Sequence, residues 1–299
     1  MIPTAQPDFL CIGAQKAGTT WLHENLSQHP GIWLPPIKEL HVLDHAPPTL
    51  LKRLLSKSSH HRLAREHLRH VLASGEHDPA VRSLAWHIAF GRRDYAWYDR
   101  LFTFAGDLVA GEICPGYARI EESVVARIAA RYPRLKIVYL LRDPVDRAWS
   151  SVAMHFRKSG DATVTGLDKQ DILARLRKPK TFAHCTYRRN IEAWSQHFPE
   201  NQVYFGFFDR MSENPQGYLS EIVNFLGLPD GFSSRNAARP VNAGKGEQIA
   251  TDIECDIAEL LLPEAEYLHQ RFDNAYTARW LAHARQLVRG SAERSLTDG

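Results

Sequence analysis

The stretch LKIVYLL at residues 135–141 is the feature that most constrains the fold of this chain. It is a near-continuous apolar run, and such a run suits a parallel strand whose two faces are both covered. Three shorter apolar runs are also expected to be strands, at residues 9–13, 108–113 and 202–208. Helical patterns lie between them, at residues 19–28, 123–132, 185–198 and 214–227. This alternation predicts an α/β fold with a central, mostly parallel sheet and flanking helices.

Two segments depart from the alternating pattern. Residues 45–80 are rich in histidine and arginine and predict a helical insertion, while residues from about 250 to 290 predict C-terminal helices, with Pro263 expected to begin a new helix. We find no repeat and no linker, so residues 1–299 are expected to form a single domain.

Composition excludes several classes of protein. A net charge of +3 is too small to indicate nucleic-acid binding, but it suits a small anionic ligand. The four cysteines form no CxxC pair, which favours a reducing, cytoplasmic location. No apolar run reaches about 18 residues, so no membrane span is expected. The sequence does not indicate an oligomeric state.

The first expected strand is followed by a loop whose sequence is typical of an anion-binding site. Gly13 and Gly18 have the spacing of a phosphate-binding loop, and the helix that follows directs backbone N–H groups at the loop. A nucleotide triphosphatase would place lysine and then serine or threonine after the second glycine. This chain has Thr19 and Thr20 there, and its lysine, Lys16, lies inside the loop.

The end of the stretch 135–141 is a second candidate site. Arg142 follows the strand, Asp143 is a helix N-cap and Pro144 stands at the first helical position. An arginine here could bind a phosphate through two parallel hydrogen bonds. Pairing of Arg142 with Asp143 or Asp146 is the alternative.

Both segments resemble a known enzyme family. GAQKAGTTWL at residues 13–22 resembles the 5'-phosphosulfate loop of sulfotransferases that use 3'-phosphoadenosine 5'-phosphosulfate (PAPS), and IVYLLRDPVDRAWSSVAMHF resembles their 3'-phosphate motif. The resemblance is to the bacterial and heparan-sulfate-type branch and runs from about residue 8 to residue 230. It implies that the 3'-phosphate is held by Arg142 and by Ser150, eight residues further on. It also assigns PAPS contacts to the loop residues Gln15, Lys16, Ala17, Gly18, Thr19, Thr20 and Trp21.

The resemblance implies transfer of a sulfuryl group to a hydroxyl or amine of a small molecule or glycan, with adenosine 3',5'-bisphosphate (PAP) as product and no metal. Lys16 would neutralise the charge that grows on the leaving group. A P-loop kinase acting on a small molecule is the alternative, and Thr19 in place of the P-loop lysine argues against it. A non-catalytic nucleotide-binding module would need neither Lys16 nor Glu39.

The general base is expected in KELHVLD, residues 38–44. The resemblance assigns this role to Glu39, and His41 is the rival because a histidine suits proton transfer near neutral pH. On an extended segment, side chains two residues apart point to opposite faces, so only one of them should face the sulfuryl group unless the chain bends. An exposed Lys38–Glu39 loop pair is the alternative.

The acceptor side is expected in two further segments that resemble the family, YAWYDRLF at 95–102 and GEICPGY at 111–117. Candidate acceptor contacts are Glu112, Tyr117, Trp97 and Tyr98, with core packing as the alternative for the aromatic residues. Ile113 stands where relatives often carry a lysine, which weakens a heparan-like acceptor. The late loop 239–247, with Arg239 and Lys245, could cover the site or be a plain surface loop. The histidines of residues 60–70 do not complete a metal site, so no metal is expected.

Overall fold

The computed structural model describes residues 6–44, 59–159, 168–229, 231–239, 241 and 249–297. Within these ranges, five strands form one sheet in the order β2-β3-β1-β4-β5, and every neighbouring pair is parallel. The strands are β1 (Phe9–Gly13), β2 (Ile32–Trp33), β3 (Val109–Ile113), β4 (Lys136–Leu141) and β5 (Val203–Phe207). The predicted α/β fold is confirmed. Only β2 was missed, because two residues are too few to show a period.

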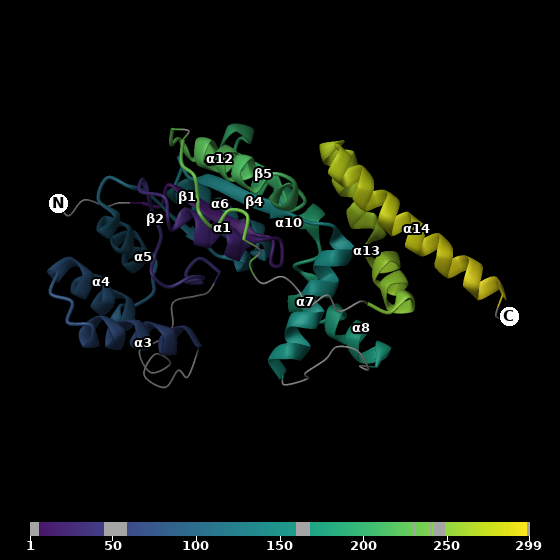
Figure 1. Cartoon of the computed structure of the whole chain (residues 1–299), viewed down its shortest axis with the longest axis horizontal. Coiled ribbons are helices and arrows are strands. Elements are labelled where there is room, and N and C mark those ends of the chain that lie inside the picture. The colour runs from purple at the N-terminus through teal and green to yellow at the C-terminus, as the bar shows by residue number, and fades with distance from the viewer. Residues whose placement is uncertain are drawn as a thin grey trace.

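The central strand β4 is covered on both faces, as its composition predicts. Residues 137–141 are at most 1% exposed. The helices expected between the strands are present as α1 (Thr19–Leu26), α6 (Glu122–Arg131), α10 (Tyr187–Ser195) and α12 (Pro215–Leu226). Helix α12 ends at Gly227, whose φ of 93° favours glycine. Figure 1 shows α12 beside β5 and the strands at the centre of the molecule.

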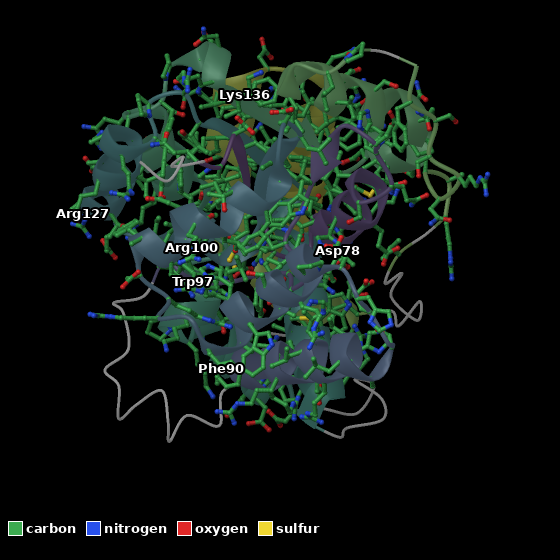
Figure 2. The ribbon with its side chains drawn as sticks, turned by 90° about the vertical axis from the view of Figure 1, so that its left-hand side faces the viewer. Asp78, Phe90, Trp97, Arg100, Arg127 and Lys136 are labelled. Atoms are coloured by element: carbon green, nitrogen blue, oxygen red, sulfur yellow. The ribbon has the colours of Figure 1, made fainter. Side chains whose placement is uncertain are left out.

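In the described part of the helical insertion, α3 (Ser59–Ala73) and α4 (Pro79–Phe90) are followed by α5 (Tyr95–Phe102). Of the predicted span 45–80, residues 45–58 lie outside the described part of the chain, and α4 continues beyond residue 80 to Phe90. Helices α3 and α4 pack on each other through a small apolar cluster that includes Leu68, Val71 and Ala85. They lie together at the lower left of Figure 1. Figure 2 shows Phe90 on this hairpin, with Trp97 of α5 between it and the rest of the molecule.

The C-terminal helices form a second apolar core with α7 (Pro144–Ser159) and α8 (Lys169–Arg177). They are α13 (Thr251–Phe272) and α14 (Ala275–Thr297), the yellow-green and yellow helices of Figure 1. The expectation that Pro263 begins a new helix is wrong, because Pro263 lies inside α13 and the break comes at Asp273, where φ is 41°. Buried Leu261, Ala265 and Leu268 anchor α13, and this packing offsets the hydrogen bond that proline removes.

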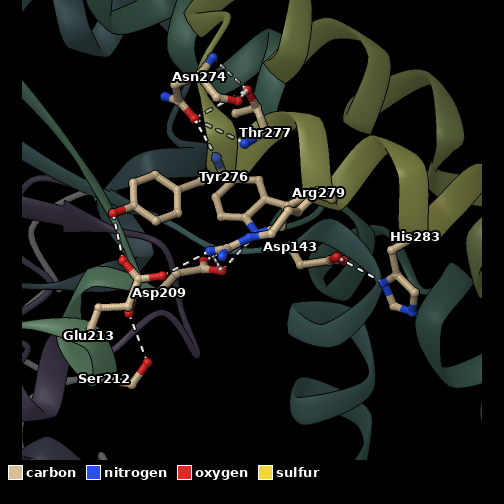
Figure 3. Close-up of polar contacts among 10 residues, drawn as sticks. Asp143, Asp209, Ser212, Glu213, Asn274, Tyr276, Thr277, Arg279 and His283 are labelled. Atoms are coloured by element: carbon tan, nitrogen blue, oxygen red, sulfur yellow. Dashed lines mark hydrogen bonds and ion pairs between the residues drawn. The ribbon is translucent and has the colours of Figure 1, made fainter.

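Helix α14 contacts residues that follow the neighbouring strands β4 and β5, as Figure 3 shows. His283 Nδ1 lies 3.0 Å from Asp143 Oδ2, and the Arg279 guanidinium lies 3.1 Å from Asp209 Oδ1. The hydrogen bond with Asp143 raises the pKa of His283. Asp143 is also the predicted N-cap of α7, because its Oδ1 accepts the Val145 N–H at 2.8 Å. The carboxyl ends of β4 and β5 are therefore held from outside the sheet.

None of the helices in the described ranges combines the length and the apolar character that a membrane span requires. All four cysteines lie in described positions, are buried and form no disulfide.

Candidate functional site

The loop of residues 14–18 joins β1 to α1 at the carboxyl edge of the sheet. Gly18 has a φ of 88°, which favours glycine, and a Cβ at this position would require the Met211 side chain to move. Lys16 also has a positive φ, 73°, and is half-buried. Ala17 and Thr19 are buried, whereas Gln15 and Thr20 are partly exposed. The first turn of α1 therefore follows directly on a tightly folded, partly open loop.

Trp21 lies on the inner side of α1 and is only 2% exposed. Its ring stacks on Tyr218 with centroids 5.9 Å apart, and its indole N–H donates to the Ala237 carbonyl at 2.8 Å. This bond attaches the segment 231–239 to the loop helix. Of the late loop expected at 239–247, only Arg239 and Val241 fall in described positions, and Lys245 lies outside them.

Arg142 links the second candidate site to the loop. Its Nη1 donates to the Lys16 carbonyl at 3.1 Å, and its guanidinium lies over the Phe208 ring at 4.5 Å. Nη2 is 3.7 Å from Asp146, so the ion pair considered from the sequence is present. Arg142 Nε nevertheless remains buried without a hydrogen-bond partner in the described structure. The two motifs, 126 residues apart in sequence, therefore meet at one place.

Helix α7 contacts the loop through residues that the sequence did not single out. The Arg147 side chain is fully buried and its Nη1 lies 3.5 Å from the Gln15 carbonyl. Ser151 Oγ donates to Gln15 Oε1 at 3.4 Å. Ser150, the predicted phosphate ligand, is the half-buried neighbour of this serine. Helix α7 thus lies along the loop.

The segment from Lys38 to Asp44 bends sharply, contrary to the expected extended conformation. Glu39 and His41 have φ values of 59° and 54°. As a result their side chains do not diverge, and His41 Nε2 lies 3.8 Å from Glu39 Oε2. On its other side His41 Nδ1 is 2.8 Å from Asp44 Oδ2. Asp44 was missed from the sequence, although an acidic residue three positions after a candidate histidine is a usable signal.

Two carboxylates hold His41 in its charged form. Burial lowers the pKa of His41, but its contacts with Asp44, Cys114 and Glu39 outweigh burial and raise the pKa to about 12. An imidazolium has no lone pair with which to accept a proton. This arrangement favours Glu39 over His41 as the base.

Glu112 holds the bent segment through a hydrogen bond to its backbone. Its Oε1 accepts the Leu40 N–H at 2.7 Å, and its Oε2 accepts the hydroxyls of Tyr98 and Tyr117 at 2.6 and 3.0 Å. The carboxyl group is 1% exposed, and burial raises its pKa to about 7 despite these hydrogen bonds. Because Leu40 lies between Glu39 and His41, its hydrogen bond to Glu112 holds the backbone that carries both side chains.

The predicted acceptor aromatics lie in the core. Tyr98 and Tyr117 are fully buried beside Glu112, and Trp97 is 5% exposed. Trp97 stacks on His87 with ring centroids 5.1 Å apart, and its indole N–H donates to the His87 carbonyl at 2.9 Å. Tyr98 and Tyr117 thus support the 38–44 segment through Glu112, and Trp97 joins α5 to α4 of the insertion. The described residues include no set of three or more His, Cys, Asp and Glu side chains arranged for a metal ion.

The model of the family described as "Sulfotransferase family" matches residues 7–233. The chain belongs to the sulfotransferase family. The matched range contains the loop, the 38–44 segment, Glu112, Arg142 and all of α7.

Curated relatives within the sulfotransferases share part of the chain. Heparan sulfate glucosamine 3-O-sulfotransferase 3B1 from Homo sapiens is 32% identical over 159 residues, which cover 50% of this chain and 40% of the relative. Bifunctional heparan sulfate N-deacetylase/N-sulfotransferase 2 from Homo sapiens is 23% identical over 234 residues, 74% of this chain and 22% of the relative. The chain thus spans less than half the length of these relatives.

Solved structures share the fold at low identity. A sulfotransferase from Alicyclobacillus acidocaldarius superposes with a TM-score of 0.61 at 22% identity and covers 92% of this chain and 99% of its own. The sulfotransferase domain of the Synechococcus PCC 7002 olefin synthase has a TM-score of 0.54 at 17% identity and covers 95% and 94% of the two chains. The parallel sheet and its flanking helices are therefore those of sulfotransferases.

Proposed function

We propose that this chain transfers a sulfuryl group from PAPS to a hydroxyl or amine of a small molecule or glycan. The observation that carries the proposal is the hydrogen bond from Arg142 to the Lys16 carbonyl. It joins an arginine at the end of β4 to the phosphate-binding loop, and the hydrogen bond from Lys38 to Thr20 joins the start of α1 to the segment that carries Glu39. Membership of the sulfotransferase family supports the same reading.

The residues present fit PAPS. The loop and the first turn of α1 offer backbone N–H groups to the 5'-phosphosulfate, and the positive end of the helix favours an anion there. The buried Nε of Arg142, which has no described partner, supplies a donor for the 3'-phosphate. Ser150 lies on α7 and is half-buried, which is compatible with a second contact to the same phosphate.

Each catalytic side chain has a separate task. Glu39 accepts the proton of the acceptor hydroxyl, and His41, held between Glu39 and Asp44, keeps that carboxylate in place. Lys16 neutralises the negative charge that develops on the leaving phosphate. Glu112 and Tyr117 hold the 38–44 segment in place through hydrogen bonds, and Trp97 and Tyr98 lie buried in the core.

The acceptor is proposed more broadly than the names of the relatives indicate. Two relatives are named for heparan sulfate. Ile113 stands where such relatives often carry a lysine, so a smaller or different acceptor is equally compatible with this site. The absence of disulfides among the four cysteines supports a cytoplasmic location, which we include in the proposal.

Replacement of Arg142 by alanine tests the proposed function. Calorimetry should show that wild-type protein binds PAP more tightly than adenosine 5'-phosphate and more tightly than ATP. We expect Arg142→Ala to weaken PAP binding about 10- to 150-fold, the worth of one charge-assisted contact. Binding of adenosine 5'-phosphate, which lacks the 3'-phosphate, should change little.

Arg127→Ala is the matched control, because Arg127 is exposed on α6 and lies at the outer edge of the molecule in Figure 2. Equal weakening of both nucleotides by Arg142→Ala would make the arginine structural. Tighter binding of ATP with magnesium than of PAP would favour a kinase instead.

A further inference from the structure

A second lysine lies at the phosphosulfate loop. Lys38 comes from the segment after β2, and its Nζ donates to Thr20 Oγ1 at 2.9 Å. The side chain is 22% exposed, so it is partly withdrawn from water. The sequence suggested only an exposed loop pair with Glu39, and neither the family match nor the relatives assign Lys38 a role.

The partner of this lysine is informative. Thr20 is the second residue of α1, at the position where the hydroxyl of a nucleotide triphosphatase loop binds magnesium. Here the same hydroxyl accepts a hydrogen bond from an ammonium group. A cation that belongs to the chain therefore lies beside the place where a metal ion would lie in the related loop.

Lys38 also lies beside the proposed base. Its Nζ is 3.9 Å from Glu39 Oε1. Burial lowers the pKa of Lys38, and the nearby carboxylates of Glu39 and Glu24 act in the opposite direction. A partly desolvated ammonium interacts more strongly with a nearby anion than one in bulk water does. The charge is thus located between the loop that holds the donor and the side chain that activates the acceptor.

We propose that the Lys38 ammonium binds the terminal sulfuryl group of PAPS and is a further catalytic residue. This inference rests on the proposed function. In the reaction, the acceptor oxygen forms a bond to sulfur while the bond from sulfur to the bridging phosphate oxygen breaks, and its electron pair leaves with PAP. The acceptor proton goes to Glu39. Lys38 remains protonated and donates to the sulfuryl oxygens, while Lys16 acts on the leaving phosphate.

The two nucleotides separate this role from a purely structural one. PAPS carries the sulfuryl group and PAP does not, so a residue that binds this group should affect only PAPS. We expect Lys38→Met to weaken PAPS binding about 10- to 100-fold and to change PAP binding by less than about threefold. Binding is measured by calorimetry without acceptor, and chromatography confirms that the PAPS is intact.

Lys38→Gln is the second variant, because it keeps an N–H donor for Thr20 but removes the charge. It should lose PAPS affinity as Lys38→Met does while its melting temperature stays close to that of the wild type. Lys136→Met is the matched control. Lys136 is also partly buried and donates to the Phe225 carbonyl at 2.7 Å, but it is the first residue of β4 and so lies at the edge of the parallel sheet opposite the loop.

Three results would overturn the inference. Equal weakening of PAPS and PAP would mean that Lys38 only holds the loop. Unchanged PAPS binding in both Lys38 variants would mean that it does not contact the sulfuryl group. PAPS binding that falls in Lys38→Met but survives in Lys38→Gln would assign the effect to the Thr20 hydrogen bond. If the wild type fails to bind PAP at all, the proposed function itself is wrong, and that result is distinct from these three.

Discussion

Replacement of Glu112 by glutamine should change how the stability of the protein depends on pH. Glu112 is buried, and its pKa is raised from 4.5 to about 7 by loss of solvation. Glutamine has nearly the same shape and retains an oxygen to accept the Leu40 N–H. The substitution therefore removes the titration of this group and leaves the support of the 38–44 segment largely in place.

The sign and size of the effect follow from the direction of this shift. Between pH 4.5 and about 7 the folded protein keeps a proton on Glu112 that the unfolded chain has released. The contribution to stability is fully present below pH 4.5 and is lost as pH rises through 7. One pKa unit corresponds to about 1.36 kcal/mol, so the free energy of unfolding should fall by about 2.5 kcal/mol between pH 5 and pH 8 because of this group.

The assay is urea unfolding of wild type and Glu112→Gln at pH 5, 6, 7 and 8. Other groups titrate in this range, so the informative quantity is the difference in pH dependence between the two proteins. We expect the variant to lack about 2.5 kcal/mol of the wild-type decrease, equivalent to about 4 °C in melting temperature for a chain of this length. Glu259→Gln, an exposed carboxylate on α13, is the control and should reproduce the wild-type curve. Parallel curves for wild type and Glu112→Gln would refute the inferred titration.

Three further predictions concern turnover. Lys16→Ala should lower turnover about 10²- to 10³-fold while PAP binding falls only modestly, because its charge matters most as the leaving group departs; a turnover assay beside a PAP titration checks this, and equal losses would contradict it. Glu39→Gln should keep the melting temperature and PAP affinity but lower turnover about 10²- to 10⁴-fold at saturating PAPS. His41→Ala should lower turnover less than Glu39→Gln does. Because His41 is charged throughout the range around pH 6.5, the wild-type pH profile should show no inflection from this histidine that the substitution could remove. A nearly normal Glu39→Gln enzyme beside an inactive, folded His41→Ala enzyme would reverse the assignment.

The sequence by itself determined the elements whose signals are local. The apolar run before Arg142 became β4, Asp143 and Pro144 began α7, and Gly227 ended α12. Burial of a strand, capping of a helix and a left-handed glycine each depend on a few neighbouring residues, so the pattern of those residues is sufficient. The phosphate-binding loop is also a local signal, because Gly13 and Gly18 lie in one short segment of the sequence.

The tertiary structure decided what the candidate residues do. The pattern of KELHVLD predicts an extended segment, yet hydrogen bonding of Leu40 to Glu112, 72 residues away, accompanies a bend that turns Glu39 and His41 toward each other. Pro263 reads as a helix start, but packing of α13 in the second core keeps the helix continuous. In both cases a distant contact outweighs a local preference of about 1–3 kcal/mol.

The contacts that define the site are also non-local. Arg142, after β4, reaches Lys16, and Lys38, after β2, reaches Thr20 only because the parallel strands β2, β3, β1 and β4 lie in one sheet and bring their carboxyl ends to one edge. Strand order arises from the packing of the whole chain and leaves no mark on the residues of any one segment. The sequence could therefore name the chemical groups, whereas the distances between them, and with these the protonation of His41 and Glu112, depend on the folded sheet.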